Sequence, residues 1–181
     1  DLLEISRIDA GAAQIETAPL DLHAMTLSVI NEFEEIATNH NAEIIFASPE
    51  GPVFVEADSR RISRIVRNLV ANAIEHCEGG PIHISVCQNN ESVSVSVRDE
   101  GHGIAPEDFD RVFSRFWRAD PSRSRVRGGT GLGLSMALED ARLHNGELEV
   151  YGEPGRGANF VLTLPKHAGG EIPQRIIPLK F

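Results

Sequence analysis

Two asparagines are the first residues of this 181-residue sequence whose spacing suggests chemistry. Asn68 and Asn72 lie four positions apart in a stretch with helical periodicity, so both amides project from one flank of the predicted helix. An amide oxygen is a hard, neutral ligand, and Mg²⁺ takes few protein ligands besides water and substrate phosphates. One asparagine could therefore hold Mg²⁺ beside a nucleotide. The alternative is two polar residues at a wet helix edge.

A second candidate is a carboxylate at the end of a predicted strand. Alternating Val and Ser residues lead to Asp99, and Gly101 and Gly103 follow in an Asp-x-Gly-x-Gly turn. A carboxylate held there can accept a hydrogen bond from an exocyclic amine such as adenine N6, while the glycines let the base approach the backbone. Guanine presents an oxygen instead, and two acceptors facing each other in a desolvated pocket are costly. The alternative is an ordinary Asp-x-Gly turn.

A glycine-rich loop runs directly into another predicted helix. Backbone N–H groups at such a helix start form a local positive site for phosphates. The loop lacks the G-x-G-x-x-G spacing and the preceding strand of a dinucleotide-binding fold. Its candidate phosphate-binding residues are Gly129, Thr130, Gly131, Leu132 and Gly133.

Six arginines precede this loop between positions 111 and 127. The run has no apolar periodicity after Trp117, which predicts a mobile basic lid over the phosphate site. The alternative is a solvated loop.

Periodicity predicts the elements that position these residues. Helices are expected at 1–10, 22–37, 59–76, 106–117 and 134–144, with Asp21 and Asp58 as N-caps, and strands at 43–47, 53–56, 82–87, 93–97, 147–151 and 159–164. This order predicts an α+β fold, a two-layer sandwich whose mixed, mostly antiparallel sheet carries its helices on one face. A doubly wound fold is excluded.

Composition limits the classes of function. Seventeen Lys and Arg against 27 Asp and Glu give a net charge of −10, so we expect no nucleic-acid partner and only a local anion site. No stretch approaches the ~20 apolar residues of a membrane span, and no signal-peptide pattern opens the sequence. Cys77 and Cys87 form neither a metal-type pair nor a disulfide framework, which fits a cytoplasmic location.

In this order the motifs resemble the catalytic ATP-binding domain of sensor histidine kinases, which has the Bergerat fold of the GHKL superfamily. The motifs are Asn-x-x-x-Asn, Asp-x-Gly-x-Gly, Phe113-Ser114-Arg115-Phe116, Gly-Thr-Gly-Leu-Gly-Leu and a final Gly-x-Gly. The resemblance implies the end of a second dimerisation helix at 1–12, a linker at 13–20, the catalytic domain at 21–166 and a C-terminal tail at 167–181. We expect the tail to pack on the surface or to be mobile. Residues 113–123 and 139–144 look most like one actinobacterial member.

The resemblance also implies a role for each candidate residue. Asn72 would hold Mg²⁺, and Asn68 would lie beside it near the phosphates as part of the catalytic centre. Asp99 would bind adenine N6 in a pocket shaped by Gly101 and Gly103. The loop residues 129–133 would contact phosphates, and Arg118 would approach the γ-phosphate.

Three further positions follow from the resemblance. Phe113 and Phe116 would anchor the lid to the domain. Glu75 departs from the family, because many relatives carry a Lys or Arg there that reaches a phosphate. His76 stands where the family often has Tyr or His, with a packing, ribose-edge or catalytic role.

The residue type at position 68 also distinguishes the ATP-hydrolysing members of the superfamily from the kinases. ATP-hydrolysing relatives such as gyrase, Hsp90 and MutL carry a Glu there that activates water, and an amide cannot take a proton in the same way. The resemblance therefore implies a protein histidine kinase that transfers the γ-phosphate of ATP to a histidine. No histidine of this chain lies in the family's acid-Arg-Thr-Pro phosphoacceptor pattern, so we expect a fragment without the acceptor. The alternatives are a non-catalytic ATP-binding regulatory module or another GHKL-type ATPase.

The implied cofactors are ATP and Mg²⁺. The implied partners are the dimerisation and phosphoacceptor domain of the same kinase and an OmpR-like response regulator. The parent protein would be a membrane-anchored homodimer with this chain in its cytoplasmic portion.

Overall fold

A computed structural model describes residues 14–117 and 131–181, together with Leu3 and Ser6. The helix predicted at 1–10 lies outside this part of the chain, apart from those two helical residues. The elements are β1 (Ala18–Asp21), α2 (Leu22–Asn39), β2 (Glu43–Ala47), β3 (Phe54–Ala57), α3 (Ser59–His76), β4 (Pro81–Gln88), β5 (Ser92–Asp99), η1 (Pro106–Asp108), α4 (Gly133–Leu143), β6 (Glu147–Glu153) and β7 (Gly157–Pro165).

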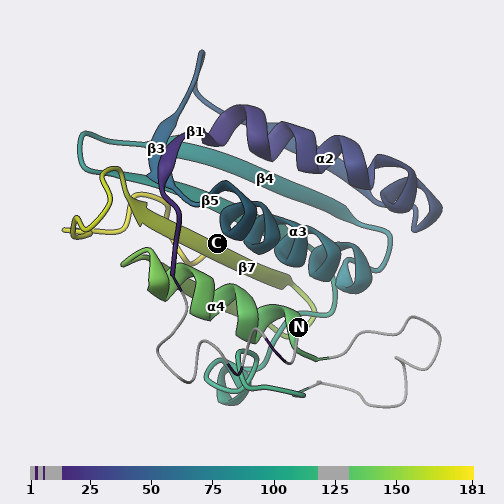
Figure 1. Cartoon of the computed structure of the whole chain (residues 1–181). Helices are drawn as coiled ribbons and strands as arrows, with labels where there is room; N and C mark the ends of the chain where they lie inside the picture. The colour runs from purple at the N-terminus through teal and green to yellow at the C-terminus, as the bar shows by residue number, and fades with distance from the viewer. Residues whose placement is uncertain (1–2, 4–5, 7–13, 118–130) are drawn as a thin grey trace.

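A five-stranded sheet in the order β2-β4-β5-β7-β6 forms one layer, and α2, α3 and α4 lie across one of its faces (Figure 1). β2 pairs with β4 in parallel, whereas the other three pairings are antiparallel. β1 and β3 form a separate antiparallel pair. The predicted α+β sandwich with a mixed, mostly antiparallel sheet is confirmed.

The central strand β5 shows how the sequence divides the sheet into two faces. Val93, Val95 and Val97 are buried in the core together with the apolar side of α3. Because successive strand side chains point to opposite faces, Ser94 and Ser96 face away from the helices. The Ser94 hydroxyl hydrogen-bonds the Thr163 hydroxyl of β7 at 2.8 Å. Small polar side chains of β5 and β7 therefore lie on the second face, away from the core.

Both predicted N-caps are confirmed. The Asp21 carboxylate accepts hydrogen bonds from the N–H groups of His23 and Ala24 at the start of α2. Asp58 does the same for Arg60 and Arg61 at the start of α3. These caps satisfy backbone donors that have no partner inside the helix, and so they fix where each helix begins.

The helix predicted at 106–117 is wrong. Only the 3₁₀ turn η1 forms, and a series of turns follows it, with hydrogen bonds from Ser114 N–H to Arg111 O at 2.9 Å and from Trp117 N–H to Ser114 O at 3.2 Å. Phe116 has a positive φ of 62°, a conformation that interrupts a right-handed helix. Strand β1 also falls within the stretch predicted as linker, where it pairs with β3.

A buried carboxylate joins α3 to α4. Asp140 has no exposed surface, and its oxygens accept hydrogen bonds from Arg61 at 2.9 Å and from Arg64 at 2.8 and 2.9 Å. The bidentate contact with Arg64 is the strongest geometry available to such a pair. Because Arg61 and Arg64 lie in the first turns of α3, this contact fixes α4 against it.

His144 makes a second connection just beyond α4. Its Nε2 accepts a hydrogen bond from the Asp58 N–H at 3.0 Å, so its Nδ1 carries the proton and donates to the Asp140 carbonyl oxygen at 2.7 Å. The cap of α3 and the end of α4 are thus tied to each other.

The segment after β7 turns back over the sheet face that the helices leave open. The Ala168 N–H donates to Glu56 at 2.9 Å, and Asn159 of β7 donates to the Leu179 carbonyl oxygen at 3.0 Å. The tail predicted at 167–181 therefore packs on the domain surface. Within the described part of the chain, no helix has the length and apolar character needed to cross a membrane.

We expect Asp140→Ala to lower the free energy of unfolding by about 2–4 kcal/mol, because Arg61 and Arg64 lose their buried carboxylate. Urea denaturation followed by circular dichroism measures this change. The neighbouring Glu139→Ala is the control, since its ion pair with Arg142 is partly exposed to solvent and is worth under about 1 kcal/mol. Equal losses in the two variants would contradict a structural role for the buried pair.

Candidate functional site

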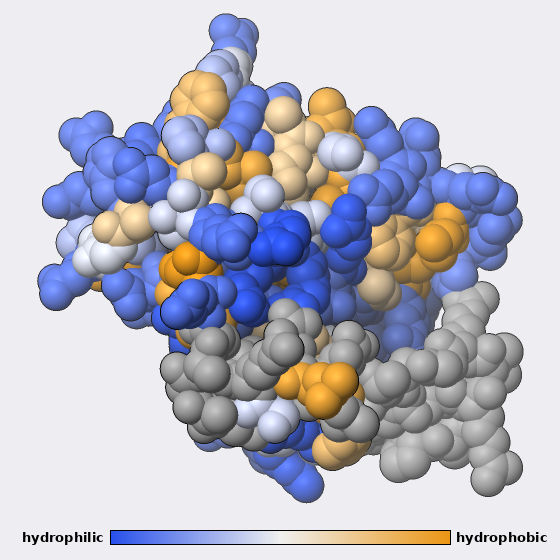
Figure 2. Space-filling model, viewed as in Figure 1, coloured by the Kyte–Doolittle hydropathy of each residue, from blue (hydrophilic) through white to orange (hydrophobic). Residues whose placement is uncertain are grey.

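Helix α3 presents a polar stripe made of Asn68, Asn72 and His76, each one helical turn from the next and each half-buried. The stripe spans about 12 Å at the rise of an α-helix. Figure 2 shows a strongly hydrophilic surface over α3 at the centre of the face that carries the helices. The two asparagines lie on one flank of α3, as the sequence predicted.

The first end of the stripe contacts the start of α4. The Asn68 amide donates a hydrogen bond to the Gly133 carbonyl oxygen at 2.9 Å. A Cβ added to Gly133 would lie 3.1 Å from the Asn68 side-chain oxygen, closer than most side chains tolerate. The close approach of the two helices at this point therefore favours glycine at position 133.

The other end of the stripe contacts the Asp99 turn, which comprises residues 99–103. A Cβ on Gly101 would lie 1.7 Å from the His76 carbonyl oxygen. Gly103 has a φ of 75°, and a Cβ there would lie 2.0 Å from the Glu153 carbonyl oxygen. Both positions exclude any other residue without a backbone shift, so the turn is held tightly between α3 and the β6–β7 connection.

Asp99 itself is 1% exposed, and its carboxylate accepts a hydrogen bond from the Gly101 N–H at 2.9 Å. Burial raises the pKa of the Asp99 carboxyl, and the Gly101 N–H only partly opposes that change by stabilising the ionised form. A buried carboxylate with spare acceptor capacity stabilises a ligand that donates hydrogen bonds to it.

The α4 start has the features expected of an anion site. Among the residues that the structure describes, no side chain caps this helix, and its first N–H groups have neither an intrahelical nor a side-chain acceptor there. Gly131 has a φ of 70°, and its carbonyl oxygen accepts a hydrogen bond from the Phe116 N–H at 2.9 Å. Leu132 is buried and anchors this turn, while the Ser135 hydroxyl bonds back to the Leu132 carbonyl oxygen at 2.9 Å.

Some predicted site residues lie outside the part of the chain that the structure describes, namely Arg118, Gly129 and Thr130. Of the two predicted anchors, Phe113 packs edge-on against Phe160 of β7, with 6.1 Å between ring centroids. The Phe116 side chain is 63% exposed, so this residue is held by its backbone and does not anchor the segment through its ring.

Sequence reasoning missed the partner of His76. The ring of His102, from the Asp99 turn, contacts the His76 ring edge-on with 4.8 Å between centroids. Burial lowers the pKa of His76, and the nearby His102 lowers it further, which favours a neutral imidazole. Glu75, next to it, is exposed.

Sequence reasoning also missed Asp140, although a signal was present. An acid stands in the apolar repeat of the helix at 134–144, while Arg61 and Arg64 stand one turn apart on the other helix. An acid on the buried side of a helix requires a cationic partner, and arginines at i and i+3 can supply it.

The described residues fit a nucleotide carrying Mg²⁺. No group of three or more His, Cys, Asp and Glu side chains suited to a metal ion occurs among residues 14–117 and 131–181. The Asn72 amide supplies a neutral oxygen only, so an ion held there would need phosphate oxygens to complete its shell.

Comparisons with known proteins agree with this geometry. Residues 57–168 match the family described as Histidine kinase-, DNA gyrase B-, and HSP90-like ATPase. Sensor histidine kinase MtrB of Mycobacterium leprae (strain TN) is 47% identical over 180 residues, which cover 99% of this chain and 32% of that protein. MtrB is the actinobacterial member that residues 113–123 and 139–144 resemble. The chain thus spans about a third of the length of this relative.

Solved structures agree as well. The catalytic domain of histidine kinase ThkA superposes with a TM-score of 0.75 at 31% identity, covering 84% of this chain and 97% of that one. Full-length ShkA, solved in complex with AMPPNP, gives a TM-score of 0.82 at 28% identity, covering 93% of this chain and 35% of that one. ThkA has also been solved in complex with the response regulator protein TrrA. From its fold, its site geometry and these similarities, the chain belongs to the histidine kinase-, DNA gyrase B- and HSP90-like ATPase family, among the histidine kinase catalytic domains.

Proposed function

We propose that this chain binds Mg-ATP and transfers its γ-phosphate to a histidine of a dimerisation domain, as the catalytic portion of a two-component sensor kinase. One observation carries the proposal: a polar stripe on α3 joins a buried carboxylate in a glycine turn to an uncapped helix start. Adenine at one end and phosphates at the other would then lie along a single helix.

Asp99 would recognise the base. Its buried carboxylate would accept a hydrogen bond from adenine N6, and Gly101 and Gly103 would shape the pocket by letting the turn pack against the His76 and Glu153 carbonyl oxygens. Guanine would place an oxygen against this acceptor. Asp99 is 1% exposed, so water could not easily enter to separate the two facing acceptors. The free-energy cost of leaving both without a hydrogen-bond donor would discriminate strongly against GTP.

The phosphates would lie between α3 and the α4 start. The uncapped N–H groups of Gly133 and its neighbours would bind phosphate oxygens, with Gly129, Thr130 and Arg118 completing the set. Asn72 would hold Mg²⁺, an ion that neutralises phosphate charge when bound. Asn68, already bonded to Gly133, would fix the distance between the metal side and the phosphate side.

Transfer would depend on positioning and electrostatics. Phosphoryl transfer demands alignment of the attacking and leaving atoms and stabilisation of charge on the transferred group. A neutral imidazole is itself the nucleophile, so the domain need not supply a general base. Asn68 fits this requirement, since its amide cannot activate water as a carboxylate does.

The proposed partners follow from the family. The acceptor histidine would lie on the dimerisation helices of the same kinase, and the phosphoryl group would pass to an OmpR-like response regulator, with MtrA as the specific candidate. The ThkA complex with TrrA supports a partner of this class. The parent protein would be a membrane-anchored homodimer.

We expect Asp99→Asn to weaken Mg-ADP binding by about 1–3 kcal/mol, because the charge-assisted acceptor is lost. The same change should not lower the free energy of unfolding, because the raised pKa of Asp99 means that its ionised form destabilises the folded state above that pKa. Calorimetric titration and urea denaturation measure the two quantities.

Wild-type affinity should also fall as the pH drops through the raised pKa of Asp99, since protonation removes the acceptor. The Asp99→Asn variant should lack that pH-dependent step. Equal wild-type affinity for ATP and GTP would contradict adenine recognition by this carboxylate.

We expect Asn72→Ala to weaken nucleotide binding mainly in the presence of Mg²⁺, because the residue is proposed to act through the ion. Titrations with ADP in Mg²⁺ and in EDTA measure the difference, with Ala71→Ser on the exposed side of α3 as the control. A defect of the same size in both buffers would mean that Asn72 contacts the nucleotide directly or only supports the fold.

The test of the whole proposal separates binding from transfer. This chain should bind ATP without labelling itself, and it should transfer the γ-phosphate slowly to a separate fragment carrying the dimerisation helices, because tethering no longer raises their effective concentration. Incubation with γ-labelled ATP should give an acid-labile, alkali-stable product. Label on this chain, or steady hydrolysis without transfer, would support one of the other branches of the superfamily.

A further inference from the structure

The tail that follows β7 crosses the sheet face opposite the helices and ends beside the Asp99 turn. Ala168 is held by Glu56, and Arg175 forms an ion pair with Glu149 of β6. Asn159 of β7 then donates hydrogen bonds to the carbonyl oxygens of Leu179 at 3.0 Å and Pro178 at 3.4 Å. The tail is thus held by β3 of the separate strand pair and by β6 and β7 of the five-stranded sheet.

Phe181 lies in a cluster of cationic and aromatic side chains. The guanidinium carbon of Arg98 lies 4.1 Å from the centre of its ring, and that of Arg156 lies 6.0 Å away. Tyr151 contacts the ring edge-on with 5.5 Å between centroids. The shorter distance to Arg98 is well within the range of a favourable cation–π contact.

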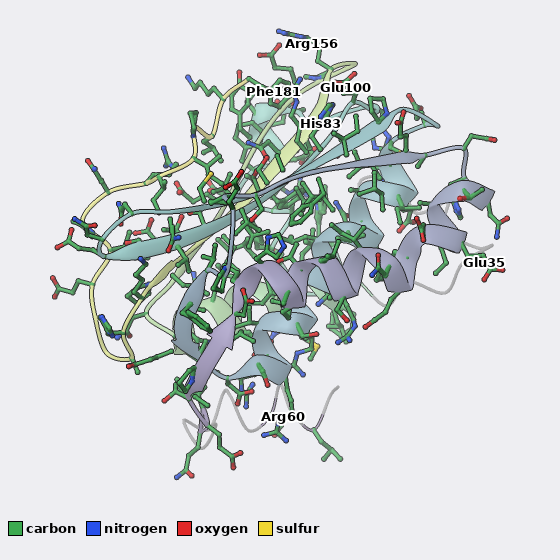
Figure 3. All side chains as sticks on the ribbon, turned by 90° about the horizontal axis from the view of Figure 1, so that it is seen from above. Glu35, Arg60, His83, Glu100, Arg156 and Phe181 are labelled. Carbon is green, nitrogen blue, oxygen red and sulfur yellow. The ribbon has the colours of Figure 1, made fainter. Side chains whose placement is uncertain are left out.

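Each neighbour of Phe181 connects to the Asp99 turn. Arg98 directly precedes Asp99 at the end of β5. Arg156 precedes Gly157, where an added Cβ would lie 1.9 Å from the Asp99 carbonyl oxygen. Figure 3 shows Phe181, Arg156 and Glu100 at the same end of the molecule, with Glu100 following Asp99 in the chain.

Tyr151 extends the cluster to the other side of the turn. Its ring contacts Phe109, just after η1, with 5.8 Å between centroids. Its hydroxyl donates to Glu153 at 2.8 Å, and Glu153 supplies the carbonyl oxygen that packs against Gly103. Phe181 therefore contacts Arg98 of β5 and Tyr151 of β6, the strands on either side of the Asp99 turn. Through Tyr151 it is also connected to Phe109, which follows the turn in the sequence.

The polar groups beneath the tail do not hold this region by themselves. Arg98 and Asn159 are cross-strand partners in β5 and β7. Arg98 Nε and Asn159 Oδ1 are both buried and have no hydrogen-bond partner within the described part of the chain. The Phe181 ring over Arg98 and the tail carbonyl oxygens that accept from Asn159 are contacts that help to orient these two side chains.

We propose that Phe181 is a positioning residue for adenine recognition. Its ring stacks on Arg98 and packs on Tyr151, and through them it holds the Asp99 turn in the shape that accepts the base. This inference rests on the proposed function of the Asp99 turn. It assigns to the tail a role in nucleotide affinity although the tail lies on the face opposite the helices and touches no part of the polar stripe.

The test compares side chains at one position. Phe181→Leu keeps an apolar side chain but removes the aromatic ring, and Phe181→Tyr restores the ring. We expect Phe181→Leu to weaken Mg-ADP binding about three- to tenfold, as the loss of one cation–π and one aromatic contact implies. Phe181→Tyr should bind as wild type does. Gln174→Ala, at an exposed position of the same tail, is the matched control and should not change affinity.

Hydrogen exchange in the nucleotide-free chain supplies a second readout. The Gly101 amide, bonded to Asp99, should exchange faster in Phe181→Leu, while amides in α2 should not change. Wild-type affinity in Phe181→Leu, or equal acceleration in α2 and at Gly101, would overturn the inference. If the wild-type chain binds no Mg-ADP, the proposed function fails, whereas the exchange comparison still reports whether Phe181 holds the turn.

Discussion

The buried ion pair of Asp140 with Arg61 and Arg64 is the contact on which the site's geometry depends. The two arginines lie at the start of α3, which carries the polar stripe, and Asp140 belongs to the helix whose first residues form the proposed phosphate end. Removing these charges from water costs free energy. The three hydrogen bonds from Arg61 and Arg64 to Asp140 offset that cost, and they form only when α3 and α4 are placed correctly relative to each other. The pair therefore specifies position more than it contributes stability.

Local patterns were sufficient to predict most of this fold. Asp21 and Asp58 marked the starts of α2 and α3 because a capping carboxylate acts on N–H groups within three residues of itself. The alternation of Val and Ser in β5 indicated a strand between two unlike faces. Asn68 and Asn72 were placed correctly on one flank of α3 because helical geometry alone relates them.

The features that were missed depend on residues far apart in the sequence. Phe109, Val112 and Phe113 have helix-like spacing, yet these residues pack against the sheet from a series of turns that their local sequence does not specify. Strand β1 has four residues and exists through its pairing with β3. The contacts of His76 with His102 and of Phe181 with Arg98 likewise join separate elements, so neither leaves a periodic signal.

Because Asn68, Asn72 and His76 share one helix, α3 fixes the distances between the parts of the site that they contact. One end is set by the Asn68 amide contact with the Gly133 carbonyl oxygen, and the other by the close approach of Gly101 to the His76 carbonyl oxygen, so both ends are fixed against the backbone of a neighbouring element. One residue inserted between Asn68 and His76 would rotate one end about 100° relative to the other and lengthen the helix by about 1.5 Å. Evolution can therefore alter this site by substitution along α3, but hardly by changing the length of that helix.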